Sequence, residues 1–337
     1  MTNRQRAIVG VGLLISVIFM ALAFRDLKPI DVWAYIQRAN PWLLLAAAVW
    51  YLGTRLVIAL RWWFLLRSTR AVPLLDLLQL VCIGYMGNNV YPLRAGEILR
   101  VLLLKREYQV PIVRTTTVIL AERVFDGIVL LSFVVVAVLT LDTGSPEVRS
   151  VITIAAPVFG VALIVFFTLA LNPATFRALL RWVCARLPDA IGSRVQPLGE
   201  HVIDGLGGLR SPGDLLGTVV TSYGTWLLEA VTFLLVAQAF ALDLDYVSVL
   251  LVVGVVNLAG LIPASPGQFG VFEGFVRITL TSLGIAVTEA TAYALVTHLV
   301  LWLPITVIGF ILLARKGLGL AAVAQADALT RREEAVT

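Results

Sequence analysis

Long runs of apolar residues separated by short polar segments dominate the chain. Most runs are about 17–25 residues long, the length at which an α-helix crosses a hydrocarbon core of roughly 30 Å. Six of them predict full membrane spans, at 7–24, 41–60, 115–141, 151–171, 215–242 and 292–314. The pattern predicts an all-α fold, a polytopic bundle of membrane helices, and excludes a β-barrel of short alternating strands.

Two further apolar runs are interrupted by proline and glycine. The run at about 74–104 breaks between Pro92 and Gly96, and the run at about 246–285 breaks between Pro266 and Gly270. We expect both to be re-entrant helical hairpins, because this topology keeps most arginines and lysines on the side that holds both termini, the cytoplasm. Broken segments in corresponding positions of two halves indicate an inverted repeat with a site between them.

The remaining segments complete the predicted organisation. Residues 1–316 form one transmembrane domain, and residues 317–337 form a polar cytoplasmic tail. Segment 172–214 mixes arginines with apolar side chains, which is typical of an amphipathic helix that lies at the membrane interface.

Composition supports the membrane class. The chain is 59% hydrophobic and only 14% charged, which excludes a soluble enzyme and a disordered chain. Its net charge of +5 comes mostly from arginine, whose guanidinium group fits phosphates, although a GC-rich genome accounts for this usage equally well. Neither a metal nor another cofactor is expected, since Cys82 and Cys184 lack metal-ligand spacing and the chain has only 2 histidines. No basic patch with interleaved aromatics indicates nucleic acid.

Charged residues inside apolar runs are the candidates for chemistry, since an unpaired charge at mid-membrane costs roughly 2.5–3.5 kcal/mol. Glu122 and Asp126 share one helix face, with Arg123 beside them. The two carboxylates need a cation, most simply Arg94 or Arg100 of the neighbouring hairpin. The alternative is a salt-bridge network that only locks the hairpin in place.

The first hairpin tip carries the best candidates for anion binding. A broken helix exposes backbone N–H groups at the positive end of its dipole. With Asn88, Asn89 and Arg94, the backbone around Gly96 forms a plausible cradle for a phosphate headgroup.

Three other polar residues lie in apolar surroundings. Glu229, in the run at 215–242, pairs with Arg277 or acts as a proton-titrating site, and pairing is the simpler interpretation. His298 is expected to be a hydrogen-bonded core residue, and Arg55 is expected to extend toward the membrane surface.

Three motifs resemble the signatures of a known family. They are Asn89 to Arg100, Glu122 to Asp126, and Pro263 to Glu273, the last with Gln268-Phe269 where the family often has more glycine. They are similar to the lysylphosphatidylglycerol synthase transmembrane family, also called flippase-like domain proteins, over roughly residues 8–315. The resemblance implies an inner-membrane protein that moves or binds lipids such as aminoacylated phosphatidylglycerol or polyprenyl-phosphate-linked sugars. Full-length synthases of the family add a soluble acyltransferase domain. We expect this chain to lack that domain, and therefore expect a non-enzymatic role.

The resulting prediction is a lipid flippase or scramblase-like transporter that binds an anionic phospholipid or polyprenyl-phosphate lipid between the hairpins. The alternatives are an integral-membrane transferase acting on a lipid-linked substrate, or a non-transporting partner of a lipid-synthesis complex. A homo-oligomer or a lipid-synthesis enzyme is expected as protein partner. The expected substrate-binding residues are Asn88, Asn89, Tyr91, Arg94, Glu97, Arg100, Glu122, Arg123, Asp126, Glu229, Gly267, Gly270, Glu273 and Arg277.

Overall fold

The computed structural model describes residues 29–68, 70–91, 95–141, 168, 172–188, 192–193, 195–197, 199–200, 203, 211–260 and 265–317. Within these ranges the fold is all-helical, as predicted. Its elements are α2 (Pro29–Ile36), α3 (Pro41–Leu66), α4 (Leu74–Val90), α5 (Ala95–Tyr108), α6 (Ile112–Thr140), α8 (Pro173–Cys184), α10 (Pro212–Ala239), α11 (Tyr246–Ala259), the 3-10 helix η3 (Pro266–Gln268), α12 (Val271–Ser282) and α13 (Val287–Arg315). The span predicted at 7–24, the span predicted at 151–171 apart from residue 168, Arg94 and nearly all of the predicted tail lie outside the described residues.

Four helices, α3, α6, α10 and α13, are long and apolar enough to cross a membrane. They confirm the helices predicted at 41–60, 115–141, 215–242 and 292–314. The predicted end of the first of these at residue 60 is wrong, because α3 continues to Leu66. Arg61 lies within this extension with both terminal nitrogens of its guanidinium paired inside the protein, so the helix does not stop at the first arginine.

Local sequence signals mark where several helices begin. The Asn40 side chain accepts a hydrogen bond from the Trp42 N–H at 3.0 Å, with Pro41 in the first turn of α3. At the start of α11, the Asp245 carboxylate accepts from the Ser248 N–H at 2.7 Å. These caps satisfy backbone N–H groups that have no partner within the helix.

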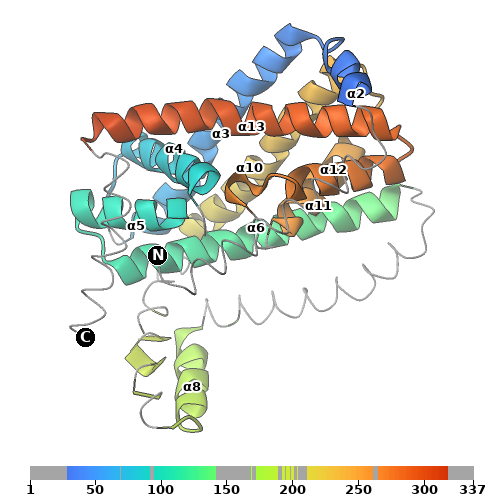
Figure 1. The fold of residues 1–337 in the computed structure, drawn as a ribbon. Coiled ribbons are helices and arrows are strands. Elements are labelled where there is room, and N and C mark those ends of the chain that lie inside the picture. The colour runs from blue at the N-terminus through green and yellow to red at the C-terminus, as the bar shows by residue number, and fades with distance from the viewer. Residues whose placement is uncertain are drawn as a thin grey trace.

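The helices form a body in which α13 and α6 run along opposite sides and α3 and α10 cross between them (Figure 1). Helices α4 and α5 lie at one end of this body and α11 and α12 at the other. Helix α4 packs against α5, α3 and α13, while α11 packs against α12, α10 and α6. We can match α3, α4, α5 and α6 with α10, α11, α12 and α13, in that order. Each of these contacts then corresponds to another contact of the same set.

The α4–α5 pair is packed at backbone distance. A Cβ atom on Gly96 would lie 1.8 Å from the Gly84 carbonyl oxygen, and one on Gly87 would lie 2.5 Å from the Gly96 Cα. Only glycine permits this approach. Trp62 and Phe125 are at the centre of the buried apolar cluster beside this pair.

The two interrupted segments meet at their tips. The end of α4 packs against η3, and a Cβ atom on Gly267 would lie 3.1 Å from the Asn89 carbonyl oxygen and 2.8 Å from the Trp302 Nε1. Two loops far apart in the sequence are therefore in contact, close to the residues that the sequence marked at each break.

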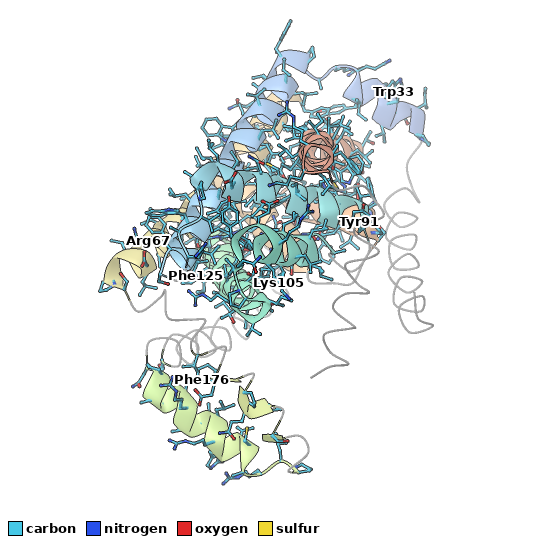
Figure 2. The ribbon with its side chains drawn as sticks, turned by 90° about the vertical axis from the view of Figure 1, so that its left-hand side faces the viewer. Trp33, Arg67, Tyr91, Lys105, Phe125 and Phe176 are labelled. Atoms are coloured by element: carbon cyan, nitrogen blue, oxygen red, sulfur yellow. The ribbon has the colours of Figure 1, made fainter. Side chains whose placement is uncertain are left out.

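Most of helix α8 projects from this body, and Phe176 near its start packs against the buried apolar cluster that contains Trp62 and Phe125 (Figure 2). Its Trp182 side chain is exposed beneath the Arg186 guanidinium, which lies 3.6 Å from the ring centroid. The Arg177 Nε donates to the Glu200 carboxylate at 2.8 Å. This helix falls in the segment with amphipathic character, and its location at the membrane interface stays a prediction.

Candidate functional site

Arg61 of α3 holds together the two carboxylates that the sequence places on one face of α6. Its Nη2 donates to Glu122 Oε1 at 2.5 Å, and its Nη1 donates to Asp126 Oδ1 at 2.7 Å. The Arg61 and Glu122 side chains are both 1% exposed. The sequence correctly indicated that these carboxylates need a cation, but the span predicted at 41–60 ended before Arg61, which α3 includes.

Arg100 of α5 is the second buried cation. Its Nη1 donates to Glu122 Oε2 at 3.2 Å, and its guanidinium carbon lies 4.8 Å from the Trp62 ring centroid. In the described part of the chain, the Arg100 Nε and Nη2 atoms have no hydrogen-bond partner. These two atoms lie on the same edge of the guanidinium group, the edge that binds a phosphate or carboxylate through two parallel hydrogen bonds.

Arg123 and Glu97 form the accessible side of the same group. The Arg123 Nε lies 3.5 Å from the Glu97 carboxylate, and its Nη1 lies 3.4 Å from Asp126 Oδ2. About a third of the Arg123 side chain (34%) and 23% of the Glu97 side chain are exposed. The carboxylate contacts of Arg123 are longer than those of Arg61, so Arg123 can exchange a carboxylate for another anion at lower cost.

Helix α10 also contacts the group. The Trp226 Nε1 donates to Asp126 Oδ1 at 2.8 Å, and the Ser222 hydroxyl lies 3.4 Å from the Arg61 Nη1. We call the six ionised residues the charge cluster: Arg61, Glu97, Arg100, Glu122, Arg123 and Asp126. Three arginines balance three carboxylates, and Arg100 is the arginine of the cluster that leaves two N–H donors of one edge unpaired.

The polar residues at the end of α4 divide between two environments. Asn88 is half-buried with its Oδ1 unpaired in the described structure, and the Tyr91 hydroxyl is likewise buried without a partner there. Asn89 instead contacts α13, where its Nδ2 donates to Thr306 Oγ1 at 2.9 Å. Asn88 and Tyr91 therefore retain hydrogen-bonding capacity, whereas the Asn89 amide is used to join the hairpin to α13.

The predicted residues of the second hairpin form a separate group. Gly267 (φ 71°) and Gly270 (φ 87°) have left-handed backbone conformations at the tip. Glu273 accepts from the Gly270 N–H at 2.7 Å and lies 2.7 Å from the His298 Nδ1. Arg277 is half-buried one turn further along α12.

Glu229 pairs with Arg55, and not with Arg277 as the sequence suggested. The Arg55 Nη2 donates to Glu229 Oε2 at 2.6 Å, near the middle of both α3 and α10. The Arg55 guanidinium lies between two tyrosine rings, 4.1 Å from the Tyr51 centroid and 4.6 Å from the Tyr85 centroid. Arg55 is fully buried, so the expectation that it extends to the membrane surface is wrong.

Sequence reasoning thus missed Arg55 and Arg61 as partners of the buried carboxylates. An available signal was that apolar residues continue through Trp62 and Trp63 after Arg61, which favours a helix that extends past the arginine. Among the described residues, no group of three or more His, Cys, Asp or Glu side chains is arranged to bind a metal ion.

Three relatives provide the comparison with known proteins. The chain is 27% identical over 319 residues to a Haloferax volcanii protein named Glycosyltransferase AglD, with 86% of this chain and 51% of that protein covered. It is 25% and 23% identical to two Methanothermobacter thermautotrophicus proteins, each named UPF0104 membrane protein, which it covers to 91% and 93% of their length. The chain therefore spans about half the length of the glycosyltransferase but nearly all of the other two.

The name of the first relative corrects one expectation. A non-enzymatic role was expected, and similarity to a protein named as a glycosyltransferase overturns that expectation. The family model described as the lysylphosphatidylglycerol synthase TM region matches residues 9–309. This chain therefore belongs to the lysylphosphatidylglycerol synthase transmembrane family and is a multi-pass membrane protein.

Proposed function

We propose that this chain binds the phosphate of a lipid-linked substrate at the charge cluster and presents the headgroup for a transfer reaction. The transferase class is favoured by the similarity to Glycosyltransferase AglD. The lipid-borne substrate is favoured by four apolar helices long enough to cross a membrane, since the tails then stay in the bilayer.

The unpaired edge of Arg100 is the observation that carries this proposal. A buried N–H group without an acceptor costs about 1–3 kcal/mol, and Arg100 leaves both Nε and Nη2 in that state. A phosphate oxygen pair satisfies both donors at once. A buried polar group without a partner calls for an explanation, and a bound anion is one that fits a pair of N–H donors.

Arg123 supplies the accessible contact for the same headgroup. Its side chain is partly exposed and its three carboxylate contacts are between 3.4 and 3.9 Å. A phosphate that approaches from this side meets Arg123 first and displaces Glu97. Asn88 and Tyr91, with unpaired polar atoms at the end of α4, contribute neutral hydrogen bonds, and Arg94 follows them in the sequence.

The family motifs and the contacts between the hairpin tips support a re-entrant arrangement. In this proposal, α4–α5 and α11–α12 enter the bilayer from opposite sides, both termini are cytoplasmic, and the protein resides in the cell membrane. The equivalent packing of α4 on α13 and of α11 on α6 supports an inverted repeat. The headgroup then binds near the meeting point of the tips, and a second copy of the chain or a lipid-synthesis enzyme is the protein partner.

Translocation of the lipid is the second candidate function. It is favoured by the contacts between the hairpin tips and by the equivalent packing of α4 on α13 and of α11 on α6. Paired broken helices with a site between them are a recurrent transporter design. In this case the charge cluster binds the headgroup while the two halves move relative to each other.

Native mass spectrometry of the purified chain with a polyprenyl phosphate and with the matching polyprenol tests the proposed binding. We expect adducts with the phosphate lipid and at least tenfold fewer with the alcohol. Equal binding of both lipids would overturn the proposal. Headgroup transfer in membranes that contain this chain, compared with movement of a labelled lipid in vesicles of the purified chain, separates the two candidate functions.

A further inference from the structure

His298 of α13 occupies an enclosed position at the tip of the second hairpin. Its ring lies between those of Phe269 and Phe272, with centroids 4.7 and 4.5 Å away. The Nδ1 atom lies 2.7 Å from Glu273 Oε1, and the Nε2 atom lies 2.8 Å from the Gly267 carbonyl oxygen. Both ring nitrogens are therefore at hydrogen-bond distance from oxygen atoms.

A neutral histidine and an ionised glutamate together have one proton too few to form both contacts. A carbonyl oxygen only accepts, so the His298 Nε2 must carry a hydrogen. Glu273 Oε1 also accepts unless it is protonated. Either His298 is an imidazolium ion beside a carboxylate, or a neutral His298 accepts at Nδ1 from a protonated Glu273. In both forms the pair holds one additional proton.

The pair fixes both ends of a strained turn. Gly267, Gln268 and Gly270 have φ values of 71°, 61° and 87°. The left-handed conformation is unfavourable for a residue with a side chain such as Gln268. His298 binds the carbonyl at the start of this turn, and Glu273 accepts from the Gly270 N–H at its end. When the proton is lost, two hydrogen-bond acceptors face each other in one of the two His298 contacts. That contact then no longer holds the turn.

The first hairpin has an equivalent pair without this property. There Glu97, in the first turn of α5, contacts Arg123 of α6, just as Glu273, in the first turn of α12, contacts His298 of α13. Arginine stays charged at all physiological pH values, whereas histidine titrates near neutrality. The two halves are thus similar in arrangement but differ in their response to pH.

We propose that Glu273 and His298 form a single-proton binding site that fastens the Gly267–Gly270 turn against the end of α4. Gain of the proton seats the turn between Asn89 and Trp302, and its loss to water as the pH rises frees the turn. This proton site is independent of the proposed lipid function, since it is defined by contacts within the protein.

Most of the surrounding charged groups are engaged with other residues in the described structure. In the described structure, Glu273 forms the ion pair of His298, Arg277 has contacts one turn further along α12, and η3 carries no titratable side chain. On the other elements packed against α13, the groups and partners are Arg55 with Glu229, Tyr85 over Arg55, Arg61 with Glu122 and Asp126, Asp76 with Tyr108, Asp214 with Arg67, and Asp31 in the first turn of α2. The titration is therefore assigned to the Glu273–His298 pair.

Hydrogen–deuterium exchange of the full chain in lipid nanodiscs, between about pH 5.5 and pH 8.5, tests the site. Rates are normalised to the intrinsic exchange rate at each pH. In the unaltered chain, we expect protection of the peptide that covers residues 265–274 to fall at least about tenfold as the pH rises, the equivalent of one lost hydrogen bond.

Glu273→Gln is the decisive variant. Its amide donates to the His298 Nδ1 and accepts from the Gly270 N–H, which reproduces the protonated pattern without a titratable carboxylate. We expect constant high protection at every pH, while His201→Gln, which removes the other histidine, keeps the pH step. A flat profile in the unaltered chain, or the same step in Glu273→Gln, would overturn the proposal.

Discussion

Arg61 and Glu122, which are 61 positions apart in the sequence, are joined by a 2.5 Å hydrogen bond in the buried contact between α3 and α6. Both terminal nitrogens of Arg61 are used, one on Glu122 and one on Asp126. Arg100 uses one nitrogen and leaves an edge unpaired. The charge cluster thus combines an arginine that holds helices together with an arginine that has capacity for a ligand.

Replacement of Arg61 should destabilise the fold. Arg61→Met leaves two buried carboxylates without their main cation, and breaking a buried pair in this way costs about 3–5 kcal/mol. Unfolding of the purified chain in detergent measures the loss. Arg177→Met is the control, because the side chains of Arg177 and its partner Glu200 are 42% and 38% exposed. We expect the control to lose about 1 kcal/mol or less, and equal losses would contradict the structural role of Arg61.

The close contact of α4 with α5 predicts a strong effect of a single methyl group. In Gly96→Ala the new Cβ atom would lie 1.8 Å from the Gly84 carbonyl oxygen, so the hairpin must separate. We expect a loss of about 1–3 kcal/mol. Gly53→Ala in α3 meets no atom within 4 Å and should stabilise the chain by up to about 1 kcal/mol. The two variants are compared by thermal unfolding in the same detergent, and a stable Gly96→Ala chain would show that the helices do not approach this closely.

Arg55 and Glu229 should behave as a coupled pair. Arg55→Met leaves Glu229 buried without its partner, which costs about 3–5 kcal/mol. Replacing Glu229 with methionine as well should recover much of this loss, since apolar residues of similar volume often substitute for a buried ion pair. A double-mutant cycle by denaturant unfolding measures the coupling. Additive losses would argue against direct pairing.

The sequence predicted the elements better than their partners. Runs of apolar residues located α3, α6, α10 and α13, because the length needed to cross a bilayer is a local property of the chain. The helical spacing of Glu122 and Asp126 correctly indicated a shared face and a need for a cation. His298 was correctly expected to be a hydrogen-bonded core residue.

The partners were harder to predict because they come from distant helices. Hydropathy ends a span at the first arginine, but Arg61 is buried where two carboxylates of α6 offset its desolvation. The same reason explains the misplacement of Arg55, whose charge is balanced by Glu229 of α10. Such pairings depend on which helices pack together, and periodicity within one helix does not contain that information.

Arg123 should contribute to lipid binding without a large effect on stability. Arg123→Gln removes a partly exposed charge whose carboxylate contacts are long, so we expect a loss of less than about 1 kcal/mol. Affinity for a polyprenyl phosphate should fall by roughly tenfold, the effect of one lost charge-assisted hydrogen bond. Titration in nanodiscs measures the affinity. Unchanged affinity would exclude Arg123 from the binding site.

Arg100→Lys tests the central proposal most directly. Lysine keeps the positive charge beside Glu122 but has no second edge of parallel N–H groups, so the ion pair is retained and the bidentate phosphate contact is lost. The measurement is the dissociation constant for a polyprenyl phosphate in nanodiscs, with detergent unfolding as the check on the fold. We predict affinity weakened by about 10- to 100-fold at nearly unchanged stability. Affinity equal to that of the unaltered chain would contradict the assignment of the unpaired Arg100 edge to the lipid phosphate.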